Sequence, residues 1–79
     1  MEKLPNTRIV GAKQTIKAVK SAKVKIVYLA ENAEEKVLNP ILDCCKQQGV
    51  EVIMIPTMQK LGQLCNIDVS AAAACTIIE

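Results

Sequence analysis

The residues with the clearest capacity for chemistry lie in the stretch 11–20. Read at 100° per residue, this stretch predicts a helix with two opposed faces. One face is cationic and polar and consists of Lys13, Gln14, Lys17 and Lys20. The opposite face is largely apolar and consists of Ala12, Thr15, Ile16 and Val19. Gly11 lies at the helix entrance, where a partner can approach free backbone N–H groups and the positive end of the helix dipole. Phosphate fits this arrangement; the alternative is a solvated lysine face that only keeps the protein soluble.

The distribution of charge supports an anionic partner. Seven of the ten basic residues lie between positions 3 and 25, with no acidic residue among them, and seven of the eight acidic residues lie at Glu31 or later. The net charge is only +2, so the asymmetry indicates a basic face on an otherwise balanced protein. Nucleic acid is the leading candidate partner, and an acidic membrane surface is the second.

Other groups that could catalyse a reaction lack partners. The chain has no histidine, its four cysteines show no C-x-x-C spacing, and neither Ser21 nor Ser70 lies in a nucleophile motif. Glu31, Glu34 and Glu35 could form a carboxylate pair, but acidic residues before a helix are more typical of a solvated turn. The sequence therefore predicts no active site, no metal site and no cofactor.

The composition predicts one small domain with an aliphatic core. We expect the domain to span residues 1–79, with residues 1–6 as a frayed lead-in. One Tyr and no Phe or Trp leave few platforms for stacking bases, and the cysteines are expected to act as small core residues in a reducing compartment. With no N-terminal apolar run and no apolar stretch of the ~18 residues that a membrane span needs, the sequence indicates a cytoplasmic protein.

Apolar runs and their boundaries predict alternating strands and helices. Strands are expected at 8–10, 24–30, 50–55 and 75–78, and helices at 11–21, 34–48 and 57–65. This order predicts an α/β fold, a single-domain three-layer α/β/α sandwich with a mixed four-stranded sheet. Two points stay open. The second helix begins at Glu34 and is kinked at Asn39-Pro40, or it begins properly at Asn39-Pro40, and the alanine run 71–74 fits no single element.

Three segments are candidates for a shared binding edge. The Gly11 entrance and the loop 31–35 each follow a strand, where open α/β sheets gather their ligand loops, and the loop 67–70 joins them if the last strand is antiparallel to its neighbours. Lys13 can donate to guanine O6 and N7, Gln14 can read a base edge, and Lys17 and Lys20 can neutralise phosphates. Ile67 and Val69 can cover an unstacked base.

Four motifs in this order resemble one known family. They are Gly11-x-Lys13-Gln14-x-x-Lys17, Ala30-Glu31-Asn32-Ala33-Glu34, Leu61-Gly62, and Ile67-Asp68-Val69-Ser70-Ala71-Ala72-Ala73. Together they are similar to the kink-turn-binding ribosomal proteins, which include an archaeal large-subunit protein that also serves modification-guide ribonucleoproteins. The Lys13-Gln14 pair resembles the small bacterial, YbxF-type branch, since archaeal and eukaryotic relatives carry Asn-Glu there. The resemblance extends from about Arg8 to Ile78.

The resemblance implies a non-catalytic protein that binds a sharply bent RNA element containing tandem sheared G·A pairs. By this likeness Gly11, Lys13, Gln14 and Lys17 meet the G·A pairs and flanking phosphates, and Asn32 and Glu34 contact an extruded nucleotide. The loop that packs on the protruding bases consists of Ile67, Asp68, Val69 and Ser70. The implied partner is structured RNA, ribosomal or riboswitch, and we expect the free protein to be a monomer.

This chain departs from the family pattern at three positions. Asn32 replaces the usual Asp, Glu35 replaces a frequent Pro, and Asn66 replaces the usual Gly. A second hypothesis is a protein-interaction or oligomerising regulatory module on the same scaffold, because a small-residue surface at Ala71–Ala74 beside Ile67 and Val69 would suit a protein partner.

Overall fold

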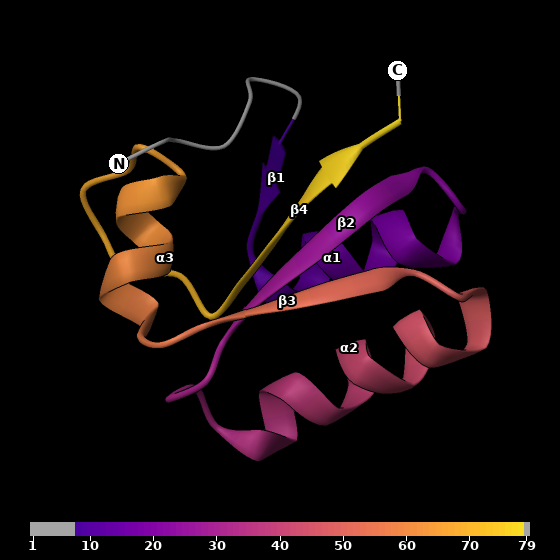
Figure 1. The fold of residues 1–79 in the computed structure, drawn as a ribbon, viewed down its shortest axis with the longest axis horizontal. Helices are drawn as coiled ribbons and strands as arrows, with labels where there is room; N and C mark the ends of the chain where they lie inside the picture. Colours follow the sequence, from indigo (N-terminus) through magenta and orange to yellow (C-terminus); the bar gives the residue numbers. More distant parts are fainter. Residues whose placement is uncertain (1–7, 79) are drawn as a thin grey trace.

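A computed structural model describes residues 8–78, and the expected lead-in lies outside these residues. Strands and helices alternate along the described chain, as the apolar runs predicted (Figure 1). The elements are β1 (Arg8–Val10), α1 (Ala12–Lys20), β2 (Val24–Ala30), α2 (Glu35–Gln48), β3 (Glu51–Ile55), α3 (Met58–Leu64) and β4 (Ala73–Ile77).

The last strand begins two residues earlier than expected. Ala73 and Ala74 pair with Leu29 and Tyr28 of β2, so half of the ambiguous alanine run belongs to β4. Ala71, Ala73 and Ala74 are buried. The expected small-residue surface at Ala71–Ala74 is therefore wrong, because most of these side chains face the interior.

The sheet has the order β1-β4-β2-β3. β4 is antiparallel to both β1 and β2, whereas β2 and β3 are parallel, so the sheet is mixed. Because β4 runs against its neighbours, the loop that precedes it lies at the edge where β1 and β2 end. Since the last strand is antiparallel to its neighbours, the loop 67–70 lies at the same edge as the Gly11 entrance and the loop 31–35.

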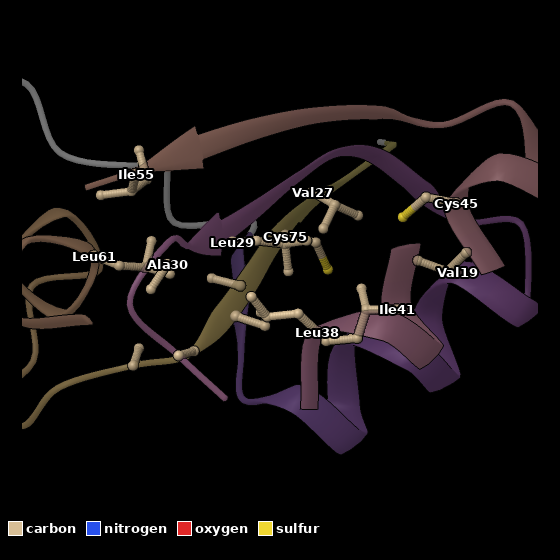
Figure 2. Packing of buried hydrophobic residues seen from close by; sticks show 14 of the residues in the cluster. Val19, Val27, Leu29, Ala30, Leu38, Ile41, Cys45, Ile55, Leu61 and Cys75 are labelled. Carbon is tan, nitrogen blue, oxygen red and sulfur yellow. The ribbon is translucent and has the colours of Figure 1, made fainter. Parts of the chain in front are cut away.

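Helices cover both faces of the sheet. α1 and α2 contact each other, and their side chains Val19 and Ile41 lie on the same side of the sheet as Leu29 (Figure 2). Successive residues of a strand point to opposite faces, so Ala30 points away from this layer. Leu61 of α3 lies beside Ala30 in Figure 2, which places α3 on the other face. The predicted three-layer α/β/α arrangement is confirmed.

The core is aliphatic, as the lack of Phe and Trp requires. Cys45, Cys65 and Cys75 belong to it and are free thiols, while the neighbouring Cys44 is half-buried. Burial raises the pKa of the thiols of Cys45, Cys65 and Cys75. These three cysteines are therefore protonated at neutral pH and serve as small apolar residues.

The boundaries of α2 show where the second helix begins. The helix begins at Glu35 and runs through Pro40 to Gln48 without a second start at Asn39. Proline removes one backbone donor from a helix, and this is tolerable here because Pro40 and the preceding turn at Lys36 are exposed to water. Gly49 ends the helix in the left-handed conformation, with φ of 68°.

Candidate nucleic-acid interface

The entrance of α1 is built by one glycine. β1 ends at Val10 and α1 begins at Ala12, so Gly11 alone makes the turn, with φ of 113°, and its N–H donates to the Ala73 carbonyl at 2.9 Å. A Cβ at this position would lie 2.5 Å from Gln14 Oε1. The absence of a side chain thus lets the amide of Gln14 fold back over the helix entrance. No side chain caps this terminus, and its first turn holds no acidic residue.

The two faces of α1 are arranged as its sequence predicted. Thr15 and Val19 are buried, and Ala18 joins them. The cationic and polar face is exposed throughout, at Lys13, Gln14, Lys17 and Lys20. Lys20 lies at the far end of the helix, roughly 10 Å along the axis from Lys13 at 1.5 Å per residue. It is thus a distant part of the basic face, away from the entrance.

The loop after β2 contains two exposed carboxylates, those of Glu31 and Glu34. Glu34 Oε2 lies 3.4 Å from Lys36 Nζ, and both side chains are largely in water. Exposed pairs of this kind contribute little free energy, so Glu34 is available to a ligand. The backbone of the loop is held by a bond from Glu31 N–H to the Ile55 carbonyl at 2.7 Å, and Ala33 is buried beneath it.

Asn32 has a structural partner that sequence reasoning did not identify. Its Oδ1 accepts a hydrogen bond at 2.8 Å from the backbone N–H of Met58, the first residue of α3. The side chain therefore joins the β2–α2 loop to α3. We interpret Asn32 as a positioning residue for the loop, and its expected contact with an extruded nucleotide stays a prediction.

The substitution Asn32→Ala is expected to lower the free energy of unfolding by about 1 kcal/mol, the usual value of an acceptor at a helix N-terminus. Asn32→Asp retains an acceptor oxygen and should keep most of that stability. Urea denaturation of both variants measures the difference. Equal destabilisation by the two substitutions would rule out the positioning role.

The loop 67–70 presents an apolar side chain to solvent. Val69 is 70% exposed, and Asp68 and Ser70 are exposed beside it. Ile67 is half-buried, and its N–H donates to the Gly62 carbonyl at 3.1 Å. Asn66 starts the loop with φ of 59°, a left-handed conformation that asparagine tolerates.

Gly62 allows this loop to lie against α3. A Cβ on Gly62 would collide with the carbonyl oxygen of Val69, and Gly62 is buried. The role of this glycine was not evident from its sequence context, because the contact joins a helix interior to a loop that follows it. Gly62 therefore allows the backbone at Val69 to lie directly against α3.

Three hydrogen bonds gather these segments at the start of β4. Gly11 N–H donates to Ala73, Ala30 N–H to Ala72, and Ala71 N–H to the carbonyl of Met58, at 2.9, 2.9 and 3.0 Å. Figure 1 shows the resulting edge, where β1 and β2 end and β4 begins. The α1 entrance, the loop after β2 and the loop before β4 thus lie together.

No group of three or more His, Cys, Asp or Glu side chains within residues 8–78 could hold a metal ion. Across the same residues, no helix has the length and apolar character to cross a membrane.

Comparison with known proteins identifies relatives over nearly the whole chain. The model of the ribosomal protein L7Ae/L30e/S12e/Gadd45 family matches residues 3–79. An RNA-binding protein of Caldanaerobacter subterraneus is 48% identical over 77 residues, which cover 98% of this chain and 94% of that protein. The RNA-binding protein YbxF of Geobacillus stearothermophilus is 35% identical over 65 residues, covering 82% of this chain and 79% of that one.

Solved structures share the fold. A protein of unknown function from Bacillus halodurans superposes with a TM-score of 0.83 at 22% identity, over 91% of this chain and 72% of the other. A 15.5 kD RNA-binding protein of Giardia lamblia gives 0.79 at 25% identity, over 92% of this chain. This chain spans 62% of the Giardia protein, less than two thirds of its length.

Proposed function

Because the chain belongs to the ribosomal protein L7Ae/L30e/S12e/Gadd45 family, as its motifs predicted, we propose that it is a non-catalytic RNA-binding protein that recognises kink-turn-like RNA. Relatives named RNA-binding proteins, at up to 48% identity, support the RNA partner. The observation that carries the proposal is the α1 entrance, where Gln14 lies over Gly11 beside an exposed lysine face.

The proposed contacts divide between base reading and phosphate binding. Lys13 and Gln14 read the edges of sheared G·A pairs from the entrance of α1, while Lys17 and Lys20 neutralise phosphates along the helix. Val69, with Asp68 and Ser70 around it, packs on a base that protrudes from the bend. The exposure of Val69 supports this role, because the free energy falls when a base covers an apolar side chain and removes it from water.

The mechanism that we infer is a shift of the RNA population. Free RNA samples extended and kinked forms, and a protein that binds only the kinked form draws the population toward it. A rigid protein surface suits this mechanism. The hydrogen bonds that join Gly11, Ala30 and Ala71 to neighbouring segments support such a surface, since they fix the three segments relative to one another.

Lys20→Ala is expected to weaken all RNAs alike and to lower the salt slope of binding by about one, because Lys20 lies far from the entrance and contacts only phosphate. Binding constants at several salt concentrations, on RNAs with and without G·A pairs, measure the slope. A loss confined to the RNA with G·A pairs would contradict this assignment.

The proposal is tested by binding titrations against two RNAs at two salt concentrations. One RNA contains tandem G·A pairs in a kink-turn context, and the other has Watson–Crick pairs in their place. We expect tight binding to the first and only weak, salt-sensitive binding to the second. Equal, weak binding to both would show that the lysine face is a general basic surface that does not recognise G·A pairs.

The natural RNA is proposed to be ribosomal or riboswitch RNA in the cytoplasm, bound by a monomer. The rival protein-interaction role loses its main support, because most of the alanine run that suggested it is buried. Size-exclusion chromatography with light scattering separates the two roles. A stable dimer that RNA does not alter would favour the rival.

A further inference from the structure

A cavity of about 280 Å³ lies beside α1, on the side away from α2. It is lined by apolar side chains from three elements, Ile9, Ala18 and Ile77, and by polar or cationic residues, Gln14, Lys17, Ser21 and Lys23. Ile9 pairs with Cys75 in the sheet, so Ile77, two residues further along β4, shares its face. We call this space the β1 groove.

The β1 groove continues the proposed RNA interface. Gln14 and Lys17 belong to both, and the groove follows α1 from its first turn to Ser21 at its end. The seven residue steps from Gln14 to Ser21, at about 1.5 Å each, give the groove a length of roughly 10 Å. A strand that leaves the α1 entrance along the lysine face would therefore pass over its opening.

The chemistry of the lining favours a nucleotide. None of the seven lining residues is acidic, and two exposed lysines, Lys17 and Lys23, carry positive charge to the groove. Apolar side chains such as Ile9 and Ile77 can pack on the flat face of an unstacked base, and lysines can pair with its phosphate. An apolar floor with cations beside it thus complements both halves of one nucleotide.

We propose that the β1 groove binds one unpaired nucleotide of the RNA strand that extends beyond the kinked element. Its base packs on Ile9 and Ile77, and its phosphate lies between Lys17 and Lys23. This inference rests on the proposed function, because it extends the same interface. It assigns binding roles to Lys23 and Ile77, which the sequence motifs did not include.

The test compares RNAs that share one G·A-containing element. One RNA is blunt, and two others carry two unpaired nucleotides at either the 5′ or the 3′ end, with 2-aminopurine as a fluorescent base. We expect one extension to tighten binding by about fivefold, as burial of one base face would produce, with a change in 2-aminopurine emission. Lys23→Ala should remove most of this gain and leave the blunt RNA bound as before.

Lys25→Ala is the matched control, because Lys25 is an exposed lysine two residues from Lys23 that does not line the groove. It should leave the gain from the extension intact. If neither extension tightens binding, or if Lys23→Ala and Lys25→Ala reduce the gain equally, the groove does not bind the RNA and its occupant is of another class. Failure of the blunt RNA to bind better than its Watson–Crick counterpart would instead overturn the proposed function.

Discussion

Replacing Gly11 with alanine is expected to weaken binding to a G·A-containing RNA by about tenfold or more and to lower the free energy of unfolding by about 1–2 kcal/mol. Two physical effects combine. The φ of 113° is costly for any residue with a Cβ, and that Cβ would lie 2.5 Å from Gln14 Oε1. The variant must therefore displace the amide that we propose reads the RNA. Affinity is measured by calorimetry and stability by urea denaturation.

Gly49→Ala is the control for this prediction. Gly49 also has positive φ, at 68°, but a Cβ there would meet nothing within 4 Å. Its replacement should cost about 1 kcal/mol of stability through backbone strain, with RNA affinity unchanged. A loss of affinity in both variants, in proportion to their loss of stability, would contradict a specific role for the α1 entrance.

The substitution Gln14→Ala is expected to cost about 1–3 kcal/mol of binding free energy on the G·A-containing RNA, a loss of affinity of about 5-fold to 150-fold. Gln14 is exposed and folds back over Gly11, so its removal affects the surface and leaves the core intact. Binding to the Watson–Crick RNA should change little, because that interaction depends on phosphate. Discrimination between the two RNAs therefore falls.

Gln47→Ala, on the exposed surface of α2, serves as the control and should leave both affinities unchanged. The thermal unfolding midpoints of the two glutamine variants, compared with that of the parent protein, establish that the fold is intact. If Gln14→Ala weakened both RNAs by the same factor, Gln14 would contribute general affinity and would not read bases.

The fold followed from the sequence because its strongest signals are local. The alternation of residues on α1 and the apolar run of β2 each specify an element without reference to the rest of the chain. The start of β4 was less predictable. Ala73 and Ala74 have low β-propensity, and they are in a strand because Leu29 and Tyr28 pair with them from the neighbouring β2.

The sequence alone indicated which residues belong to the candidate site. It did not indicate which of them hold the site's segments in place. The lysine face of α1 was evident from spacing alone. The role of Asn32 was not, because its acceptor bonds to Met58, 26 residues later, and only the folded chain brings them together. Gly62 is a similar case. Position 62 must be glycine because a side chain there would collide with the carbonyl of Val69, which comes later in the chain. Non-local contacts of this kind leave no periodic signal.

We propose that this surface binds RNA by selecting its kinked form, and energy transfer within the RNA measures that selection directly. A G·A-containing RNA carries donor and acceptor dyes on its two helical arms, and energy transfer is followed as the protein is added. We predict a saturable rise in transfer for this RNA, no rise for its Watson–Crick counterpart, and a rise that requires more protein with Gln14→Ala. Tight binding without any change in transfer, or an equal rise for both RNAs, would contradict the account.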